Sequence, residues 1–307
     1  MALLQFKRPG RTAGSDGTLS GILAGFSIEV MPRTAEKVAD FRALLPQGTR
    51  VYIAHIDGTP IEDMVRTAAR LSADGFDVMP HFPARSIPDA TTLSDWIARY
   101  QGEADIRQGL ILAGGRPDPL GDFDNSMQLL DTGLFDKAGF THLHVAGHPE
   151  GNRDIDPKGG TAEVDAALAW KQGFSEQTDA SMAIATQFAF EMAPIAAWAE
   201  GLQAQGIIMP VHLGIAGPAK LQTLIKFAIA CGVGPSLKVL QKRAMDVTKL
   251  VLPYTPDEVL RDLVAYKAAN PDSLIDQVHV FPLGGIKTSA TWIAEQSGDA
   301  TTASQQG

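Results

Sequence analysis

The sequence contains a single cysteine, Cys231, among its 307 residues. One cysteine cannot form an intramolecular disulfide, which excludes a disulfide-stapled fold and favours a reducing compartment. Cys231 follows the apolar run 227–230, so we interpret it as a packed core thiol and not as a nucleophile. The sequence also lacks a signal-peptide core and any apolar run long enough to span a bilayer. We therefore expect a cytoplasmic protein that does not contact a membrane.

Basic residues are also fewer than acidic residues. Lysine and arginine number 26 against 35 aspartates and glutamates, which gives a net charge of −9. The basic residues are scattered, which argues against a nucleic-acid surface. With 45% hydrophobic and 20% charged residues the composition is that of a soluble domain with ample core material. We expect small-molecule ligands, and a homo-oligomer is compatible with the composition.

Short apolar, β-branched segments alternate with amphipathic segments along the chain. This alternation predicts a parallel sheet, and eight repeats of it predict a closed (β/α)8 TIM barrel, an α/β fold in one domain. An open doubly wound sheet is less favoured, because no glycine-rich dinucleotide turn follows the first strand. The predicted strands are 26–32 (closed by Pro32), 50–55, 77–81, 109–113, 142–146, 182–186, 211–215 and 278–283.

Composition at the two ends of the chain predicts the domain limits. Residues 1–20 are basic and rich in small residues, which is typical of a loosely held arm, and residues 297–307 predict a disordered polar tail. The barrel would then occupy residues 21–296. Helices are predicted between the strands, among them 34–45, 127–137, 290–295 and one helix extra to the alternation, 235–249.

Polar residues and glycines follow the predicted strands, at the end of the barrel where TIM-barrel enzymes carry their active sites. Glycines let a ligand approach the backbone, so this layout favours a pocket for a flat, partly anionic ligand. Each residue taken alone is equally compatible with an ordinary polar loop. The positions are Glu29, His55, Asp57, His81, Gly114-Gly115-Arg116, His148, Glu150, Gln187, Gly214 and Gly284-Gly285.

Glu29 stands out because it lies inside a buried strand. A buried carboxylate is normally neutralised, paired with a cation or used in chemistry, and the sequence leaves pairing and function equally open. We expect burial in the barrel mouth to raise its pKa. The same strand ends could supply zinc or manganese ligands, but without HExxH-type spacing we expect no metal. No strand end bears a Schiff-base lysine, and no GxSxG elbow occurs.

Five stretches, in the same order along the chain, resemble the methylenetetrahydrofolate reductase family in a short, barrel-only form. They cover about residues 25–285, and that family also folds as a (β/α)8 barrel. The stretches are Ser27-Ile28-Glu29 with Pro32-Arg33-Thr34, Pro80-His81, Val145-Ala146-Gly147-His148-Pro149-Glu150, Ala185-Thr186-Gln187-Phe188, and Gly214-Ile215 with Pro218.

The resemblance implies an oxidoreductase that interconverts 5,10-methylenetetrahydrofolate and 5-methyltetrahydrofolate, with hydride passing from NAD(P)H through FAD to the folate. Glu29 would be the catalytic acid and Gln187 would contact the pterin. Phe188 and Arg116 would also lie at the substrate. The implied cofactor-binding residues are His55, His81, Gly114, Gly115, Ala146, His148, Glu150, Asn152 and Lys171.

The departures from the family fall mainly on the flavin side. Gly114-Gly115-Arg116 stands where the family has Arg-Gly-Asp, and His55, His148 and Asn152 replace other family residues. Arg116 could bind a phosphate or a carboxylate, or could form a surface ion pair. Three alternatives stay open: direct hydride transfer from the nicotinamide without flavin, a pterin-dependent methyltransferase or metal-dependent lyase, and a folate-binding protein that is not an enzyme.

Overall fold

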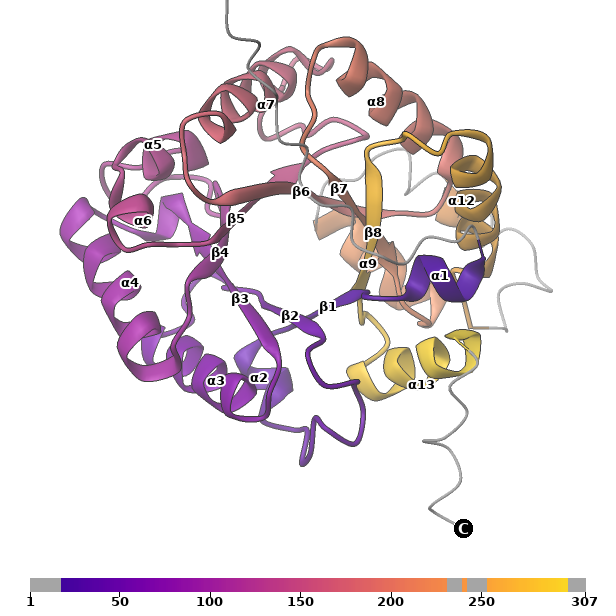
Figure 1. Cartoon of the computed structure of the whole chain (residues 1–307), viewed down its shortest axis with the longest axis horizontal. Helices are drawn as coiled ribbons and strands as arrows, with labels where there is room; N and C mark the ends of the chain where they lie inside the picture. The colour runs from indigo at the N-terminus through magenta and orange to yellow at the C-terminus, as the bar shows by residue number, and fades with distance from the viewer. Residues whose placement is uncertain (1–17, 231–238, 242–252, 298–307) are drawn as a thin grey trace, which may run out of the picture.

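The computed structural model describes residues 18–230, 239–241 and 253–297. Its eight parallel strands close into a barrel in sequence order, and β8 pairs with β1 (Figure 1). This confirms the predicted (β/α)8 fold. The strands are β1 (Ser27–Val30), β2 (Arg50–Ile53), β3 (Asp77–Pro83), β4 (Gln108–Leu112), β5 (His142–Gly147), β6 (Ser181–Ala189), β7 (Val211–Ala216) and β8 (Ile275–Phe281).

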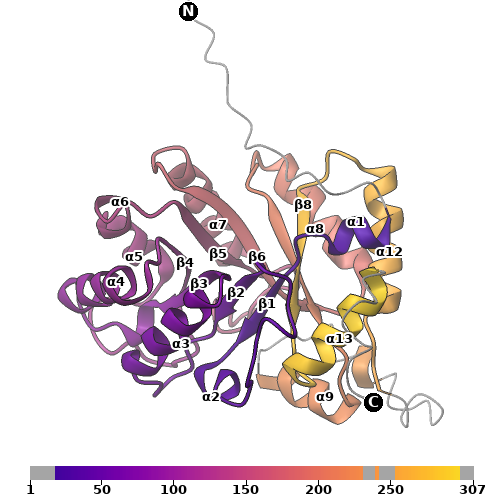
Figure 2. The same ribbon diagram turned by 60° about the horizontal axis from the view of Figure 1, so that its bottom comes forward.

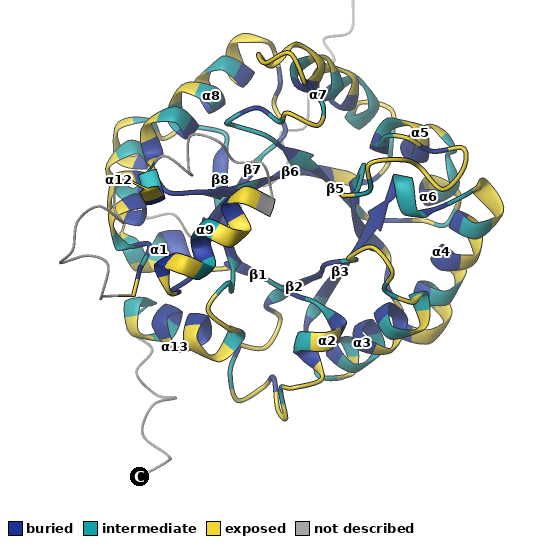
Figure 3. Ribbon diagram, turned by 180° about the vertical axis from the view of Figure 1, so that it is seen from behind, coloured by how far each residue is buried: buried dark blue, intermediate teal, exposed yellow. Residues whose placement is uncertain are grey.

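The helices surround the barrel, and their inner faces and the strands carry most of the buried residues (Figure 3). Within the described residues no helix combines the length and the hydropathy that a membrane crossing requires. The helices are α1 (Leu19–Leu23), α2 (Pro32–Ala35), α3 (Ile61–Ala73), the 3-10 helix η1 (Ala84–Ser86), α4 (Ala90–Ala104), α5 (Ser126–Asp131), α6 (Leu134–Lys137), α7 (Ala162–Ser175), α8 (Met192–Ala204), α9 (Leu221–Ala230), α12 (Asp257–Ala269) and α13 (Ile286–Ser297).

The main apolar core lies between the strands and the helices. Outward-facing strand residues such as Ile28 and Ile111 are fully buried there, with helix residues such as Met64 and Leu129. Helices α2 and α9, which follow β1 and β7, lie at the same end of the barrel (Figure 2). The carboxyl ends of the strands therefore open at this end, which we call the barrel mouth.

The inside of the barrel is more polar than usual, because branched aliphatic residues normally fill it. The ring of Tyr52 lies against the buried imidazoles of His81, His144 and His279, and His144 in turn contacts the ring of His212. The Tyr52 hydroxyl lies 2.5 Å from Nδ1 of His144. A hydrogen-bonded layer therefore lies within the barrel close to Glu29, which is paired with Tyr52 in the β1–β2 register.

The predicted helix 34–45 is wrong, because α2 ends at Ala35 and turns follow it. The guanidinium of Arg70, on α3, donates to the carbonyl oxygens of Ala35, Val38 and Ala39. A continuous helix would use such carbonyls as acceptors for its own N–H groups. The tertiary contact with Arg70 therefore outweighs the local helical pattern.

Other helix predictions differ in their ends. The predicted helix 127–137 is split into α5 and α6 at Gly133, whose φ of +65° lies in the left-handed region. Helix α13 begins at Ile286, before the predicted start at residue 290, and α1 includes the last two residues of the predicted arm. The rest of that arm (1–17), most of the predicted extra helix 235–249, and tail residues 298–307 lie outside the described residues.

Candidate active site at the barrel mouth

Glu29 projects into the barrel from β1, whose neighbouring residues Ile28 and Val30 are buried in the outer core. Its Oε2 atom lies 3.2 Å from Nε2 of His81, which belongs to β3. The same oxygen lies 4.0 Å from Nε2 of His279, on β8. The structure thus brings the predicted residues Glu29 and His81 together, and adds His279, which the sequence analysis did not single out.

His279 is held in place by the strand that carries Glu29. Its Nδ1 atom lies 2.9 Å from Oγ of Ser27, and the two residues are paired in the β1–β8 register. With Nδ1 engaged by Ser27, Nε2 is directed toward Glu29. Burial lowers the pKa of His279 to about 4, although the nearby Glu29 carboxylate raises it. His279 is therefore neutral near pH 7.

The expected rise in the pKa of Glu29 is wrong. Burial does raise this pKa, but the interactions with His81 and His279 lower it by more, so the net direction is downward. Because the carboxylate keeps its charge near neutral pH, Glu29 alone is not a proton reservoir. The Glu29 side chain is 19% exposed and lies beside His81 at the mouth.

Gln187 lies within a register shift between Ala185 and Phe188 of β6, and this irregularity leaves it out of the regular pairing with β7. The neighbouring Gly214 is required by close packing, since a Cβ there would lie 2.5 Å from the carbonyl oxygen of Thr186. Gln187 is half-buried and hydrogen-bonds His148. Phe188 is 3% exposed and packs on Phe281 in a smaller core cluster, so its ring supports the site from below.

His148 connects Gln187 to the region around Lys171. Burial lowers the pKa of His148 to about 4; the Gln187 hydrogen bond raises it and the Lys171 charge lowers it. The imidazole is therefore neutral near pH 7, and its Nδ1 lies 3.4 Å from Nδ2 of Asn152. Glu150, in the same loop, is half-buried.

A cavity of about 590 Å³ lies over the ends of β4 and β5, beside α7. Of the nine residues predicted to bind the cofactor, only Ala146, His148 and Lys171 line it. Its apolar wall is formed by Leu112, Met127, Ala146, Val164 and Leu168. Its charged residues are Arg85, Asp124, Asp154, Asp156, Lys158, Glu163 and Lys171.

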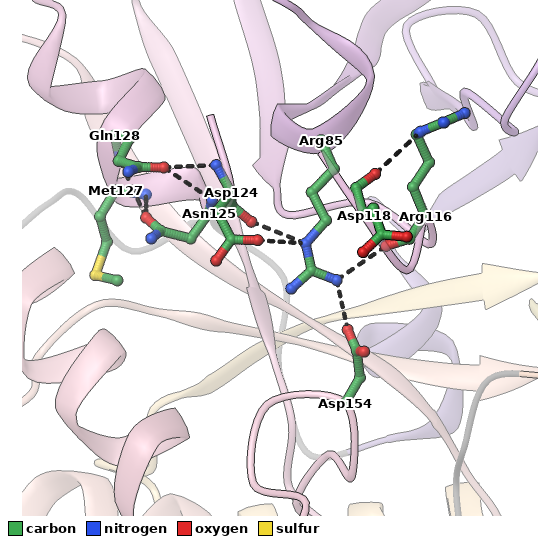
Figure 4. Close-up of polar contacts among 8 residues, drawn as sticks. All are labelled: Arg85, Arg116, Asp118, Asp124, Asn125, Met127, Gln128 and Asp154. Carbon is green, nitrogen blue, oxygen red and sulfur yellow. Dashed lines mark hydrogen bonds and ion pairs between the residues drawn. The ribbon is translucent and has the colours of Figure 1, made fainter. Parts of the chain in front are cut away.

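Arg85 lines the cavity and is one of the residues there that were not predicted from the sequence (Figure 4). Its Nε donates to the carbonyl and carboxylate oxygens of Asp124, and its Nη1 donates to the Asp154 carboxylate and the Arg116 carbonyl. The side chain thus ties η1 to the loops after β4 and β5. The sequence did contain a signal for Arg85, because it is a cation directly after the end of the strand at Phe82-Pro83.

Arg116 does not line the cavity. Its Nη1 is paired with the carboxylate of Asp57, and its Nε donates to the carbonyl of Asp118 at 3.3 Å. The pairing links the loops after β2 and β4. The adjacent Gly114 has φ +95° and lies against Pro83, so it serves a tight turn. Gly115 is exposed next to it.

His55 does not line the cavity. Its Nε2 lies 2.9 Å from the carbonyl oxygen of Thr59, and its ring stacks on Trp96 with centroids 5.0 Å apart. These contacts place it in loop packing. Within the described part of the chain, no three His, Cys, Asp or Glu side chains are arranged to hold a metal ion.

The cavity offers a poor cradle for the pyrophosphate of FAD. Anions often bind at helix N-termini, but the first turn of α7 is closed by the chain's own carboxylate. The oxygens of Asp156 accept from the backbone N–H groups of Glu163 and Val164 at 3.0 and 3.2 Å. Asp124 and Asp154 occupy the Arg85 guanidinium. The described residues that line this cavity therefore do not fit the pyrophosphate of FAD.

No protein-family model matches the chain. Among solved structures it is similar to an uncharacterized protein from Clostridium thermocellum that binds two copies of 5-methyl-5,6,7,8-tetrahydrofolic acid. The TM-score is 0.57 at 9% identity, over 89% of this chain and 96% of that chain. 7,8-Dihydropteroate synthase from Vibrio fischeri aligns over 92% and 94% of the two chains at 12% identity, with a TM-score of 0.42 that supports no argument. The first similarity establishes the shared fold.

Proposed function

We propose that the protein interconverts 5,10-methylenetetrahydrofolate and 5-methyltetrahydrofolate, with NAD(P)H as the hydride donor. The observation that carries the proposal is the Glu29–His81 pair at the barrel mouth, 3.2 Å apart. The five ordered motifs that resemble the reductase family support the choice of reaction. The choice of folate is also supported by the tetrahydrofolate bound to the Clostridium thermocellum protein of the same fold.

The reaction needs one proton and one hydride. Protonation of a ring nitrogen breaks its bond to the bridging methylene and leaves an iminium, and hydride from the nicotinamide then adds to that carbon. In the proposed step the Glu29–His81 pair takes up a proton from solvent and passes it to the folate nitrogen, and Glu29 is left as the carboxylate again. General acid catalysis of this kind typically contributes about 10²–10⁴ in rate.

Gln187 and His148 would orient the pterin. A primary amide can donate to one edge atom of a heterocycle and accept from another, and Gln187 is held by its contact with His148. The neutral His148 adds a polar group without adding charge. This places the positioning residues on β5 and β6, across the barrel from the proton-holding pair on β1 and β3.

The route of the hydride is proposed to be direct. FAD would supply a two-electron relay between nicotinamide and folate, but the residues present do not fit its pyrophosphate. We therefore propose transfer from NAD(P)H to the folate with no flavin step. The spectrum of the purified protein tests this point, because bound flavin absorbs near ~450 nm. A stoichiometric flavin band would contradict direct transfer while leaving the folate reaction intact.

The decisive experiment measures nicotinamide oxidation that depends on methylenetetrahydrofolate, in the wild type and in Glu29→Gln. The control is Glu103→Gln, which removes an exposed carboxylate from α4 that pairs only with Arg99. We expect activity in the wild type and the control and its loss in Glu29→Gln. Wild-type protein that binds folate yet never oxidises NAD(P)H would refute the reductase.

A further inference from the structure

The cavity over β4 and β5 holds a buried cation without a counter-charge. Lys171 extends from α7 to line the cavity and is 6% exposed. Across residues 18–230, 239–241 and 253–297, no carboxylate, carbonyl or hydroxyl is paired with its ammonium group. Burial lowers the pKa of Lys171 to about 8, and no other group contributes. A buried ammonium in this state is costly unless a ligand balances it.

The other cations of the cavity are already used or lie at its rim. Arg85 is 12% exposed at its side chain and makes ion pairs with Asp124 and Asp154, at 3.0 and 2.8 Å. Lys158 is exposed in the loop between β5 and α7. Lys171 is therefore the one positive charge inside the described cavity that can receive an anion.

The form of the cavity restricts that anion. The Asp156 carboxylate already accepts from the N–H groups of Glu163 and Val164 in the first turn of α7, so these two donors are not free for a phosphate. The four acids of the lining would repel a group with several charges. The lining also contains apolar residues, among them Leu112, Met127 and Leu168. One charge and an apolar body fit these surroundings.

We infer that this cavity binds a carboxylic acid with an apolar body, and that the Lys171 ammonium is the counter-ion of its carboxylate. A carboxylate bound to a buried ammonium makes charge-assisted hydrogen bonds, which are about twice as strong as neutral ones. The inference does not depend on the folate reaction, because Glu29 and His81 take no part in it.

Calorimetric titration with 4-aminobenzoate as the probe tests the site, with inorganic pyrophosphate as the multiply charged comparison. We expect 4-aminobenzoate to bind the wild type more tightly than pyrophosphate does. Lys171→Met should weaken 4-aminobenzoate binding at least tenfold, as expected for loss of a charged hydrogen bond. Lys137→Met, which removes an exposed charge from α6, should bind like the wild type. Equal binding of 4-aminobenzoate by Lys171→Met, or tighter binding of pyrophosphate than of 4-aminobenzoate by the wild type, would overturn the inference.

Thermal unfolding of the unliganded variants separates binding from structure. Lys171→Met removes an uncompensated buried charge, so its melting temperature should equal or exceed that of the wild type. A lysine with a structural role would lower it. Ala167→Phe, on the same helix, fills the cavity and leaves Lys171 in place. It should abolish 4-aminobenzoate binding, and retained binding would place the probe elsewhere and refute the site.

Discussion

The two sides of the barrel mouth treat charge in opposite ways. On the side of β1, β3 and β8, the carboxylate of Glu29 lies beside two imidazoles, His81 and His279. On the side of β4 and β5, the arginines are held by aspartates, and the buried Lys171 has no ion-pair partner among the described residues. The first arrangement suits proton transfer and the second suits capture of an anion. A charged residue at a strand end is thus informative only once its partners are known.

The largest expected effect comes from removing the acid on the first side. Glu29→Gln should reduce folate turnover by about 10²–10⁴, the usual contribution of general acid catalysis. The amide cannot share a proton with His81, yet it keeps the shape of the side chain. Steady-state kinetics measure the loss, and circular dichroism checks the fold. Folate kinetics like those of the wild type would remove Glu29 from the mechanism.

Acidification should destabilise the folded protein through His279, which lies on the first side of the barrel mouth. Its folded-state pKa of about 4 lies below the usual unfolded value near 6.5, so the unfolded chain binds the proton first. Stability is therefore full above about pH 6.5 and falls as the pH drops toward 4. Lowering the pH from 7 to 5 should reduce the free energy of unfolding by about 2 kcal/mol through His279 alone, since one pKa unit corresponds to ~1.4 kcal/mol. Urea unfolding of the wild type and of His279→Gln at pH 7 and pH 5 measures this loss of stability. An equal pH dependence of stability in the two proteins would contradict the prediction.

Gln187→Ala tests the boundary between the two sides. Loss of a buried neutral hydrogen bond costs about 1–3 kcal/mol, so folate affinity should fall about tenfold. Affinity for NAD(P)H should change less, because the amide is proposed to face the pterin. Separate titrations with folate and nicotinamide measure the difference. Equal losses for both ligands would indicate general disruption around His148.

Arg85→Ala should destabilise the second side. The substitution leaves Asp124 and Asp154 without their cation and frees the Arg116 carbonyl. The guanidinium is mostly buried but both carboxylates are exposed, so we expect about 1–2 kcal/mol after allowance for solvent screening. Chemical denaturation measures this loss of stability. Arg85→Lys should recover only part of the lost stability, because lysine lacks the forked geometry of the guanidinium group.

Arg116→Ala is the matched case with the smallest expected effect. Its partner Asp57 is 53% exposed, and exposed ion pairs contribute about 0–1 kcal/mol. We expect folate and NAD(P)H affinities close to those of the wild type. A tenfold loss of either affinity would restore Arg116 to the ligand-binding role that its position in the sequence predicts.

The fold was accessible from the sequence because periodicity and turn residues mark each strand, and closure of eight parallel strands follows from their number. Residues at the same end of a barrel also meet, which is why Glu29 and His81 come together from separate motifs. The partners of Arg116 and His55 were not accessible, because they depend on loop conformation. Arg116 and Asp57 are 59 residues apart in sequence. The prediction of a helix at 34–45 was wrong for a similar reason, because the tertiary contact with Arg70 could not be predicted from the local sequence.

The barrel closes where β1 meets β8, and the proposed active site lies on that seam. Ser27 and His279 are joined across 252 residues of sequence. Domains generally form as units, N-terminal parts first, during synthesis. A nascent chain therefore carries the Glu29 motif early but gains its His279 neighbour only when the last strand docks. Incomplete chains would carry Glu29 and His81 without the third member, His279, so the surroundings of Glu29 are complete only when the barrel closes.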